Sequence, residues 1–546
     1  MKKVNRTNSL LFILLILSSF YRAQSFALDW VKQMGGSGET VLISHIGTDK
    51  LGNIYTLGTF SGTPDFNPGP GTYTLSTHGF YNCFLSKLDS SGNFLWAQPL
   101  DSIGAVDLAI GRSGNIYVLG RGPGPFFFII VSKLNSLGNI VWIKKSGSPL
   151  YSTTVCSESS LALDSVENVY TTGTLFGSVD FDPDTSKYIV TTPEVNVQSY
   201  GYRPTTNFYL SKLDSTGKFV FVKTVTKDLG FGFPLTKGVI SAKGEVVALD
   251  GESSIYKYDL NGNLLWSQDV GFFSSDLTVD RANNINLVGY FSGYIDCDPG
   301  PDTYYLGSTG GGTISSLFAI QLTNSGNFGW ARRVDDWNNF YSPVLKTTTD
   351  AARNLYIAGS FKGTVNFDPS GQTVNPDSPA GSGFILRYDA YGNFNWVKEV
   401  GENSSSGINA MTMDDYGNLY TAGTFAGTVD FDPASGMDNL TSFGSNDAFI
   451  HKLGIQQLVT GIQSQSSDKK LSIFPNPTNG LVYVQVTETL DDAICKLTDI
   501  SGKIVLERRN VSARTFALDL SEQPKGFYML EISDNQTVSR IKLVKE

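Results

Sequence analysis

The chain has 546 residues, 57 of them glycine, and a formal net charge of −10. This length exceeds one ordinary hydrophobic core and indicates at least two domains, while the abundant glycine and the low charged fraction of 17% suit a turn-rich all-β protein. Because the balance is acidic and no basic run occurs, the composition argues against nucleic acid or an anionic membrane surface as a partner.

The N-terminus has the pattern of a secretory signal peptide. Lys2 and Lys3 precede an apolar run from Leu10 to Leu17, which is shorter than the roughly 20 residues that a membrane-spanning helix needs. No later apolar run is long enough either. We therefore expect residues 1–24 to be removed during export, leaving a mature protein that has no transmembrane segment and acts as a monomer.

Two sequence patterns repeat between this segment and residue 455. Gly-Asn-x-Tyr-x-x-Gly occurs seven times when degraded copies are counted, and Lys-Leu-Asp-x-x-Gly-Asn-x-x-Trp occurs six times, again with degraded copies. Such a period is typical of a repeat architecture. The first pattern begins at Gly52, Gly114, Glu167, Gly244, Asn283, Arg353 and Gly417, and the second spans 87–96, 133–142, 212–221, 257–266, 321–330 and 387–396.

The missing seventh copy of the second pattern suggests a closed ring. The last repeat stops at Gly454, while a lone Asp29-Trp30-Val31-Lys32 stands near the N-terminus. In a circular array this N-terminal strand would pair with the last three strands of the final repeat. With four strands per repeat, residues 25–455 are predicted to form a seven-bladed β-propeller. The repeats resemble the SBBP-type repeats of bacterial surface proteins, and this resemblance implies the fold but no ligand.

The tryptophan that ends the second pattern allows two interpretations. Asp-x-x-Gly-x-x-x-Trp is similar to the docking motif of propellers that hold pyrroloquinoline quinone, but the turn here is one residue shorter and the vicinal cysteine pair of those enzymes is absent. Packing of each tryptophan against the neighbouring blade explains the repeat without a cofactor. We therefore expect no cofactor.

Five repeats contain Phe-x-Gly-x-x-Asp-Phe-Asp-Pro or a near copy, at 60–68, 175–183, 291–299, 361–369 and 425–433. The paired carboxylates could supply oxygen ligands to Ca²⁺. Each pair offers only two ligands, however, and asparagine replaces one carboxylate at Asn67 and at Asn366. A turn in which the side chain accepts backbone hydrogen bonds accounts for the same pattern, and we favour it. The candidate calcium ligands are Asp180, Asp182, Asp296, Asp298, Asp430 and Asp432.

Cysteine and histidine give little sign of a catalytic or metal site. The four cysteines lack paired or metal-ligand spacing and are interpreted as buried small hydrophobic residues, although their even number permits disulfides in an exported protein. The three histidines have no partner at metal-ligand spacing, and no nucleophile elbow or phosphate-cradling loop occurs. No catalytic residue is predicted. The residues concerned are Cys83, Cys156, Cys297, Cys495, His45, His78 and His451.

The C-terminal part reads as a linker at 456–470 followed by a separate domain at 471–546. Short alternating strands between turn signals predict an immunoglobulin-like β-sandwich. Its motif residues are Pro475, Asn476, Pro477, Gly480, Gly502, Gly526, Tyr528, Lys542 and Lys545. In this order they resemble the type A C-terminal sorting domain (Por secretion) of cargo for the type IX secretion system of Bacteroidetes. The resemblance implies contact with that machinery, export, removal of the domain, and release or attachment at the outer cell surface.

Two classes of function remain open for the propeller. The long connections between its strands would gather on one face, opposite the tight turns, and could bind an extracellular protein or polysaccharide in an adhesion role. The alternative is a secreted carbohydrate-active enzyme, which needs only two of the 51 acidic residues. Two carboxyls about 5 to 9.5 Å apart in a deep cleft would favour the enzyme.

Overall fold

The structure is a computed structural model that divides into two compact units, Met1–Gln457 and Leu458–Glu546. Every described element is a strand, which confirms the all-β prediction, and none of the described residues form a helix long and apolar enough to cross a membrane. The predicted signal peptide, residues 457–470, Pro475 and Gly502 lie outside the described residues. The structure describes residues 25–545 except 77–81, 102, 123–127, 148–154, 198–200, 227–236, 251–252, 309–314, 338–343, 370, 372–373, 402–405, 434–435, 445, 457–470, 475, 479, 487–489, 491–492, 500–502 and 534–537.

The first unit contains seven four-stranded sheets, named here blades 1 to 7 and given from the innermost strand outward. Blade 1 is β2 (Thr40–Thr48), β3 (Ile54–Ser61), β4 (Cys83–Leu88) and β5 (Phe94–Pro99), and blade 2 is β6 (Gly104–Ile110), β7 (Ile116–Arg121), β8 (Ile129–Leu134) and β9 (Ile140–Ser146). Blade 3 is β10 (Val155–Leu163), β11 (Val169–Phe176), β16 (Thr206–Leu213) and β17 (Phe219–Thr226), and blade 4 is β18 (Lys237–Ile240), β19 (Glu245–Leu249), β20 (Ser254–Asp259) and β21 (Leu264–Asp269).

The other three blades follow the same plan. Blade 5 is β22 (Asp276–Val279), β23 (Ile285–Phe291), β26 (Ser315–Leu322) and β27 (Phe328–Trp337), and blade 6 is β28 (Lys346–Thr349), β29 (Leu355–Thr364), β30 (Asp377–Tyr388) and β31 (Phe394–Val400). Blade 7 is β32 (Gly407–Met413), β33 (Leu419–Phe425), β36 (Asp447–Gln456) and β1 (Ser25–Met34). The first sequence pattern therefore lies between two strands in all seven blades, and the second pattern does so in blades 1 to 6.

The innermost strands follow one another around a closed ring. β2 contacts β6, β6 contacts β10, and the series continues through β18, β22, β28 and β32 back to β2. Buried side chains from adjacent blades share hydrophobic clusters, as Tyr55 and Leu57 of blade 1 do with Ile116 and Val118 of blade 2. This arrangement is a β-propeller, as the repeats predict.

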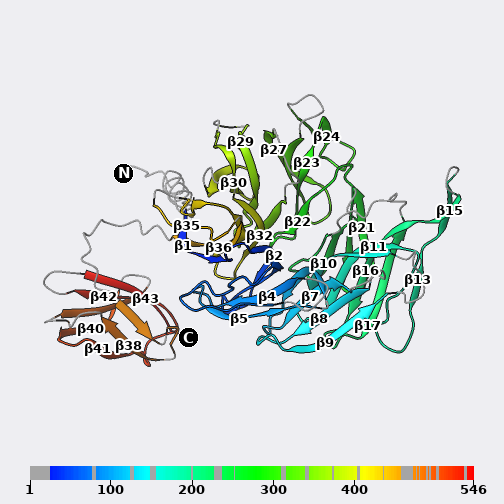
Figure 1. The fold of residues 1–546 in the computed structure, drawn as a ribbon. Helices are drawn as coiled ribbons and strands as arrows, with labels where there is room; N and C mark the ends of the chain where they lie inside the picture. The colour runs from blue at the N-terminus through cyan, green and yellow to red at the C-terminus, as the bar shows by residue number, and fades with distance from the viewer. Residues whose placement is uncertain are drawn as a thin grey trace, which may run out of the picture. The chain divides into compact units, whose positions relative to one another are not determined.

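The N-terminal strand completes blade 7, as the missing sequence copy predicts. β1 lies antiparallel to β36 with Trp30 opposite Lys452, and Figure 1 shows blue β1 beside gold β36. Phe26 is buried, with its ring centroid 5.7 Å from that of Tyr356 and 6.0 Å from that of Trp396, both in blade 6. The N-terminal strand therefore ties the last blade to its neighbour.

The two short hairpin turns of blade 1 show how the glycines of both sequence patterns are used. In blade 1, Gly52 and Gly92 have φ angles of 75° and 79°, a region that glycine adopts at little cost. Their amides donate to the carbonyl oxygens of Asp49 and Asp89. Because the strands run alternately up and down, both turns lie at one end of the blade, the tight-turn end. The longer connections lie at the opposite, long-loop end.

Tryptophan packs between blades, as the sequence analysis predicts. A Cβ atom on Gly217 would lie 3.2 Å from the Trp142 ring, and one on Gly392 would lie 2.5 Å from the Trp330 ring. Each ring therefore covers the glycine of the next blade's outer turn. Burial differs between copies, because Trp330 is 7% exposed whereas Trp142 is only half-buried. Trp142 is less buried because its outermost strand has one face in solvent.

Small two-stranded hairpins extend the blades at the long-loop end. Three of them contain the Asp-Phe-Asp-Pro elements and one is formed elsewhere in blade 3. The pairs are β12 (Ser178–Asp180) with β13 (Ile189–Thr191), β14 (Glu194–Val197) with β15 (Gly201–Pro204), β24 (Tyr294–Asp296) with β25 (Tyr305–Gly307), and β34 (Thr428–Asp430) with β35 (Asn439–Thr441).

The second unit consists of two antiparallel sheets around one hydrophobic core. The three-stranded sheet is β37 (Leu471–Phe474), β38 (Leu481–Val486) and β41 (Thr515–Asp519), and the four-stranded sheet is β40 (Ile504–Val511), β39 (Ala493–Asp499), β42 (Gly526–Ser533) and β43 (Val538–Lys545). Val484 and Phe516 of the first sheet share this core with Leu497 and Leu530 of the second. The immunoglobulin-like topology remains a prediction.

Candidate functional site

Several residues of the sorting motif stabilise the second unit. Asn476 joins two parts of it, because its Nδ2 donates to the carbonyl of Lys542 at 2.8 Å and its Oδ1 accepts from the amide of Val544 at 2.8 Å. The Tyr528 hydroxyl donates to the carbonyl of Pro524 at 2.6 Å, an arrangement like the tyrosine corner of β-sandwiches. These side chains hold the end of the chain against the preceding strands.

The glycines of the motif and its two lysines differ in surroundings. A Cβ atom on Gly480 would lie 2.7 Å from the Ser521 Oγ atom, and Gly526 has a φ of 155°. Lys545 is buried and its ammonium donates to the carbonyls of Leu520, Ser521 and Gln523. Lys542 instead lies in solvent, with its ammonium 4.1 Å from the ring centroid of the exposed Phe527. The remaining motif residue, Pro477, follows a cis peptide bond.

The predicted calcium ligands accept backbone hydrogen bonds. In blade 3 the Oδ1 atom of Asp180 accepts from the amides of Asp182 and Tyr188 at 3.2 and 2.8 Å. The Oδ1 atom of Asp182 accepts from the amide of Asp184 at 3.0 Å. These are the hydrogen bonds of the turn that the sequence analysis favours. Within the described part of the chain, no three or more His, Cys, Asp or Glu side chains come together as a metal site.

The other elements repeat this geometry. Oδ1 of the first carboxylate accepts from the amides two and eight residues later, at 3.1 and 2.9 Å for Asp296 and at 3.0 and 2.9 Å for Asp430. The Oδ1 atom of Asn366 does the same at 3.1 and 3.3 Å, so an amide side chain satisfies the turn without a negative charge. The Oδ1 atom of Asp298 accepts from the Gly300 amide at 2.8 Å. Asp432 donates its own amide to Asp430.

The aromatic residue between the two acidic positions anchors each hairpin in its blade. Phe431 is fully buried, and its ring centroid lies 5.2 Å from that of Phe425 and 4.8 Å from that of Phe449. Cys297 takes the corresponding place in blade 5 and is also buried. The hairpins therefore close the blade cores at the long-loop end.

At the opposite end, an acidic side chain organises the inner turn of most blades. In blade 6, Asp350 accepts from the amides of Ala352 and Asn354 at 2.9 Å each, from the Asn354 Nδ2 atom at 2.6 Å and from the Tyr356 hydroxyl at 3.0 Å. Burial, followed by the charge of Asp350, raises the pKa of Tyr356. The Arg387 guanidinium lies 3.9 Å from the same carboxylate. This explains why Asn and Tyr recur in the first sequence pattern.

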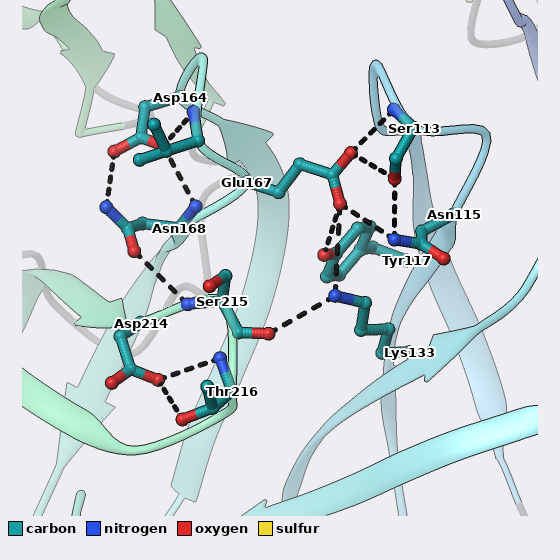
Figure 2. A network of polar contacts seen from close by, with 11 residues as sticks. Ser113, Asn115, Tyr117, Lys133, Asp164, Glu167, Asn168, Asp214, Ser215 and Thr216 are labelled. Carbon is teal, nitrogen blue, oxygen red and sulfur yellow. Dashed lines mark hydrogen bonds and ion pairs between the residues drawn. The ribbon is translucent and has the colours of Figure 1, made fainter.

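Blade 2 lacks this acidic residue and obtains a carboxylate from blade 3. Figure 2 shows Glu167 reaching to the turn of blade 2, where its carboxylate accepts from the Ser113 amide at 2.8 Å, the Asn115 Nδ2 atom at 2.9 Å and the Tyr117 hydroxyl at 3.0 Å. Burial opposes ionisation, but the hydrogen bonds from Asn115 and Ser113 outweigh it and lower the pKa of Glu167 to about 2. A Cβ atom on Gly111, which stands where Asp350 stands in blade 6, would lie 2.5 Å from this carboxylate.

Lysines on the third strands connect five of the seven blades to the next one. The Lys133 ammonium lies 3.8 Å from Glu167 and donates to the carbonyl of Ser215 in blade 3 at 3.3 Å. At the closure of the ring, Lys452 pairs with Asp29 of β1 at 2.8 Å and donates to the carbonyl of Ser90 in blade 1 at 3.2 Å. The tight-turn end is thus a network fixed by charge-assisted hydrogen bonds.

One layer of polar side chains lies on the innermost strands, four residues before each inner turn. His45 lies 3.4 Å from Asp107, whose other carboxylate oxygen accepts from the Leu161 amide of blade 3 at 2.8 Å. In the same way Lys237 lies 3.5 Å from Asp276. The other oxygen of Asp276 accepts from the amide and hydroxyl of Thr347 in blade 6 at 2.8 and 3.1 Å. Each carboxylate therefore links three blades. The layer consists of His45, Asp107, Ser160, Lys237, Asp276 and Lys346, and blade 7 has the apolar Ala410 at this position.

The charges of this layer interact across the ring. Burial lowers the pKa of His45 to about 4, against the opposing effect of Asp107, and Lys346 and Lys237 of blades 6 and 4 lower it further. Burial, and then the charge of Lys237, also lower the pKa of Lys346. Among the residues that the structure describes, Lys346 forms no ion pair, so one cation of the layer is not neutralised by a direct partner.

Two cavities open at the tight-turn end of the ring, above this layer. The larger has a volume of about 590 Å³ and lies between the innermost strands of blades 1, 2 and 7. The second, of about 450 Å³, lies between blades 2, 3 and 4, and Arg112 lines both. Lys50 and Asp415 line the larger cavity and Lys243 the smaller. We call this region the ring mouth.

The other residues singled out from the sequence are structural where they are described. Cys83, Cys297 and Cys495 are buried free thiols, and burial raises the pKa of Cys297 to about 12. His451 is fully buried, with a pKa lowered to about 3 by burial. The side chain of Cys156 and all of His78 lie outside the described residues.

Comparison with known proteins agrees with both halves of the chain. A family model described as a secretion system C-terminal sorting domain matches residues 472–546, and a model described as a beta-propeller repeat (SBBP) matches residues 29–59. A WD repeat-containing protein of Acanthamoeba polyphaga mimivirus is 25% identical in an alignment of 209 residues that covers 34% of this chain. The chain spans only 15% of the length of that relative.

Three solved structures illustrate the structural likenesses. A protein of unknown function from Bacteroides caccae is 11% identical, with 67% of this chain and 94% of that chain covered and a TM-score of 0.31. BamB from Moraxella catarrhalis is 11% identical, with 80% and 96% covered and a TM-score of 0.27. PorZ, a surface component of the type IX secretion system of Porphyromonas gingivalis, is 10% identical, with 92% and 81% covered and a TM-score of 0.23.

One matched region lies within each of the two units of the structure. The propeller repeat falls on β1 to β3, and the sorting domain falls on β37 to β43. The chain is thus a β-propeller protein of the SBBP-repeat type that carries a type IX secretion C-terminal sorting domain, and this domain directs it to the cell surface or the medium.

Proposed function

We propose that the chain is an exported binding protein whose ligand site is the ring mouth. Two adjacent cavities of about 590 and 450 Å³ lie there, within the range of volumes usual for ligand sites. Their rim is held in place by the carboxylate network of the inner turns. The exposed side chains of Lys50, Arg112 and Asp415 remain available to a ligand, because none of the three forms an ion pair with a described residue.

From the sequence we expected a ligand to bind at the long-loop face. The proposed site lies instead at the tight-turn end of the ring. At the long-loop end the Asp-Phe-Asp-Pro hairpins use their carboxylates for their own turns and bury their aromatic residues. Parts of the long connections lie outside the described residues. The ring mouth is therefore the site that the described residues support best.

A carbohydrate-active enzyme gains no specific support from the ring. The two acidic residues of the polar layer, Asp107 and Asp276, each use both carboxylate oxygens to bind groups of neighbouring blades. A general acid or nucleophile needs an oxygen directed at the substrate. These two carboxylates instead act as links within the ring.

The delivery of this binding protein follows from its C-terminal unit. In our proposal the propeller covers residues 25–455, a linker covers 456–470, and the sorting domain at 471–546 is removed after the type IX machinery has recognised it. The released or surface-attached propeller then presents the ring mouth to an extracellular ligand.

The same substitution at opposite ends of the ring tests the site. Asp415→Trp places a bulky ring at the mouth, whereas Asp302→Trp places it on the exposed loop between β24 and β25 at the long-loop end. The full-length protein and both variants are screened for binding to an array of purified polysaccharides and matrix proteins. We expect at least one probe to bind the parent and Asp302→Trp but not Asp415→Trp. Binding lost only in Asp302→Trp, or no probe that depends on Asp415, would contradict the proposal.

A further inference from the structure

Exposed cations gather at the ring mouth although the chain as a whole carries −10. The second residue of the inner turn is Lys50 in blade 1, Arg112 in blade 2 and Arg281 in blade 5, and the first two of these line the cavities of the mouth. Only blade 7 has an acidic residue there, Asp415. Lys243 in the turn of blade 4 adds a further cation. All five side chains are exposed, and within the described residues none forms an ion pair.

The acidic residues nearest to these cations do not neutralise them. Asp49 accepts hydrogen bonds from the amides of Leu51 and Asn53 at 2.9 and 3.0 Å, and Asp164 accepts corresponding bonds in blade 3 at 3.1 and 2.9 Å. Each of these two carboxylates also has a lysine of its own blade beside it. Asp49 lies 3.9 Å from Lys87, and in blade 3 burial lowers the pKa of Lys212 while the charge of Asp164 opposes this effect. Of the acidic residues that line the larger cavity, Asp415 has an exposed carboxylate without such bonds among the described residues.

The two cavities form neighbouring subsites that share one guanidinium. Arg112 lines both, Lys50 lies in the larger and Lys243 in the smaller. A guanidinium binds a carboxylate through two parallel hydrogen bonds, while lysine acts as a point charge. Three cations spread over adjacent cavities suit a linear ligand that carries a negative group on successive units.

A second source of positive potential lies behind the mouth. Lys346 belongs to the polar layer, four residues before the inner turn of blade 6. Because Asp276 is already bound by Lys237 and Thr347, the charge of Lys346 is left to attract an anion in the ring opening. Charges of one sign in a concave site raise the local concentration of an oppositely charged ligand.

The lining of the mouth distinguishes among acidic ligands. The strands end there, so no sheet edge is offered to which an acidic peptide could add as a further strand. The few cations and the net charge of −10 do not suit nucleic acid. Thr48, Thr412 and Ser165 line the cavities beside the charged residues, and such a polar surface suits the hydroxyl groups of a sugar chain.

We infer that the ring mouth binds an acidic polysaccharide through the carboxylates of its uronic acid units. Arg112 binds one carboxylate at the boundary of the two cavities, and Lys50 and Lys243 bind those on either side. This inference rests on the proposed function, because it names the ligand class of the same site.

Calorimetry on the full-length chain tests the charge requirement. The probe is an oligomer of polygalacturonate, and its methyl-esterified form is the matched neutral control. We expect Arg112→Gln and Lys50→Gln each to weaken polygalacturonate binding about tenfold, the effect of losing one charge-assisted contact. Asp415→Asn should strengthen binding. Lys187→Gln, which removes an exposed cation on the β12–β13 hairpin, should leave binding unchanged.

Three outcomes would overturn the inference. They are equal binding of the methyl ester, equal binding of dextran sulfate, and binding that Arg112→Gln does not weaken. A neutral polysaccharide or a protein whose binding is lost in Asp415→Trp but kept in Arg112→Gln would preserve the ring mouth as the site and refute only the acidic ligand. If no probe responds to Asp415→Trp, the proposed function fails as well.

Discussion

The inner turn of most blades contains an aspartate of that same blade, such as Asp350 in blade 6. In blade 2 the carboxylate comes instead from Glu167 of blade 3. Its backbone has a φ of 64°, a conformation that glycine adopts more easily. Its carboxylate receives four hydrogen bonds and lies 3.8 Å from Lys133. The inner turn therefore requires a carboxylate at a point in space, whichever blade supplies it.

An exchange of two residues tests this requirement. Gly111→Asp should destabilise the protein because the new side chain meets the Glu167 carboxylate, and Glu167→Gly should destabilise it because buried donors lose their acceptor. Each is expected to cost about 1 to 3 kcal/mol of unfolding free energy. The double variant should recover most of that loss, since it recreates the turn of blade 6. Chemical denaturation of the three variants measures the coupling.

Arg353→Gly is the matched control for the exchange. Arg353 has a φ of 68° at the same turn position of blade 6 but does not replace a missing carboxylate. Relief of backbone strain alone should make this variant neutral or slightly more stable. If Glu167→Gly behaves like Arg353→Gly, the carboxylate is not needed.

The Asp-Phe-Asp-Pro turns make a separate prediction about metal ions. Because Asn366 supports the same turn as Asp430, Asp430→Asn should change the unfolding free energy by less than about 1 kcal/mol, whereas Asp430→Ala should cost about 1 to 2 kcal/mol. A chelator should leave the melting temperature of the parent protein unchanged. A fall of many degrees with EDTA, restored by Ca²⁺, would show that these carboxylates hold a metal.

The outermost strands hold the blades together through one aromatic side chain each. Trp330 is 7% exposed and lies against Gly392 of the next blade, whereas Trp142 is half-buried over Gly217. Trp330→Ala should therefore cost about 3 to 5 kcal/mol, the range for large buried aromatic residues, and Trp142→Ala about 2 kcal/mol. Thermal denaturation of both variants shows which of the two substitutions costs more stability. Equal losses in the two variants, or a quinone found bound to the purified native protein, would contradict a role in packing alone.

The N-terminal strand is the element on which closure of the ring depends. Deleting residues 25–34 removes β1, the buried Phe26 and the Asp29 partner of Lys452. We expect a large fall in the melting temperature and partial recovery when a peptide of residues 25–34 is added, because the exposed edge of β36 can pair with it. An unchanged melting temperature in the truncated protein would refute this mode of closure.

Local periodicity predicts the strands and turns of this chain well, and it predicts less well what connects them. The Gly-Asn and Asp-x-x-Gly patterns specify turns, and strands lie on both sides of them, as β4 and β5 do on either side of Asp89 to Gly92. Contacts between blades depend on the three-dimensional arrangement and cannot be predicted from sequence spacing. The role of Glu167 is evident only when blade 2 lies beside it. The same holds for Gln321, which donates to Asn286 at 2.9 Å, whereas blades 1, 2, 3 and 7 pair Lys with Tyr at this place.

The ring mouth could not be read from the sequence for a related reason. Its cations stand at turn positions that vary among blades, so no repeated motif marks them. Their significance arises when the closed ring brings Lys50, Arg112 and Lys243 to one opening. The sorting residues were easier to predict because Asn476, Tyr528 and Lys545 fix local contacts of a common unit.

At the scale of the whole molecule, one unit supplies the binding surface and the other supplies the route of export. Each unit has its own hydrophobic core. Removal of the second unit should therefore leave the propeller folded while abolishing its delivery. Folding of the propeller and its export thus depend on different units of the chain.

The most direct test is the location of a chain that ends at Leu458, expressed in a host with the type IX apparatus. We expect it to accumulate in the periplasm with the melting temperature of the processed propeller, while the full-length chain reaches the surface or the medium. Its appearance outside the cell at the normal level would contradict the sorting role of residues 471–546, and accumulation in an unfolded form would contradict the independence of the two units.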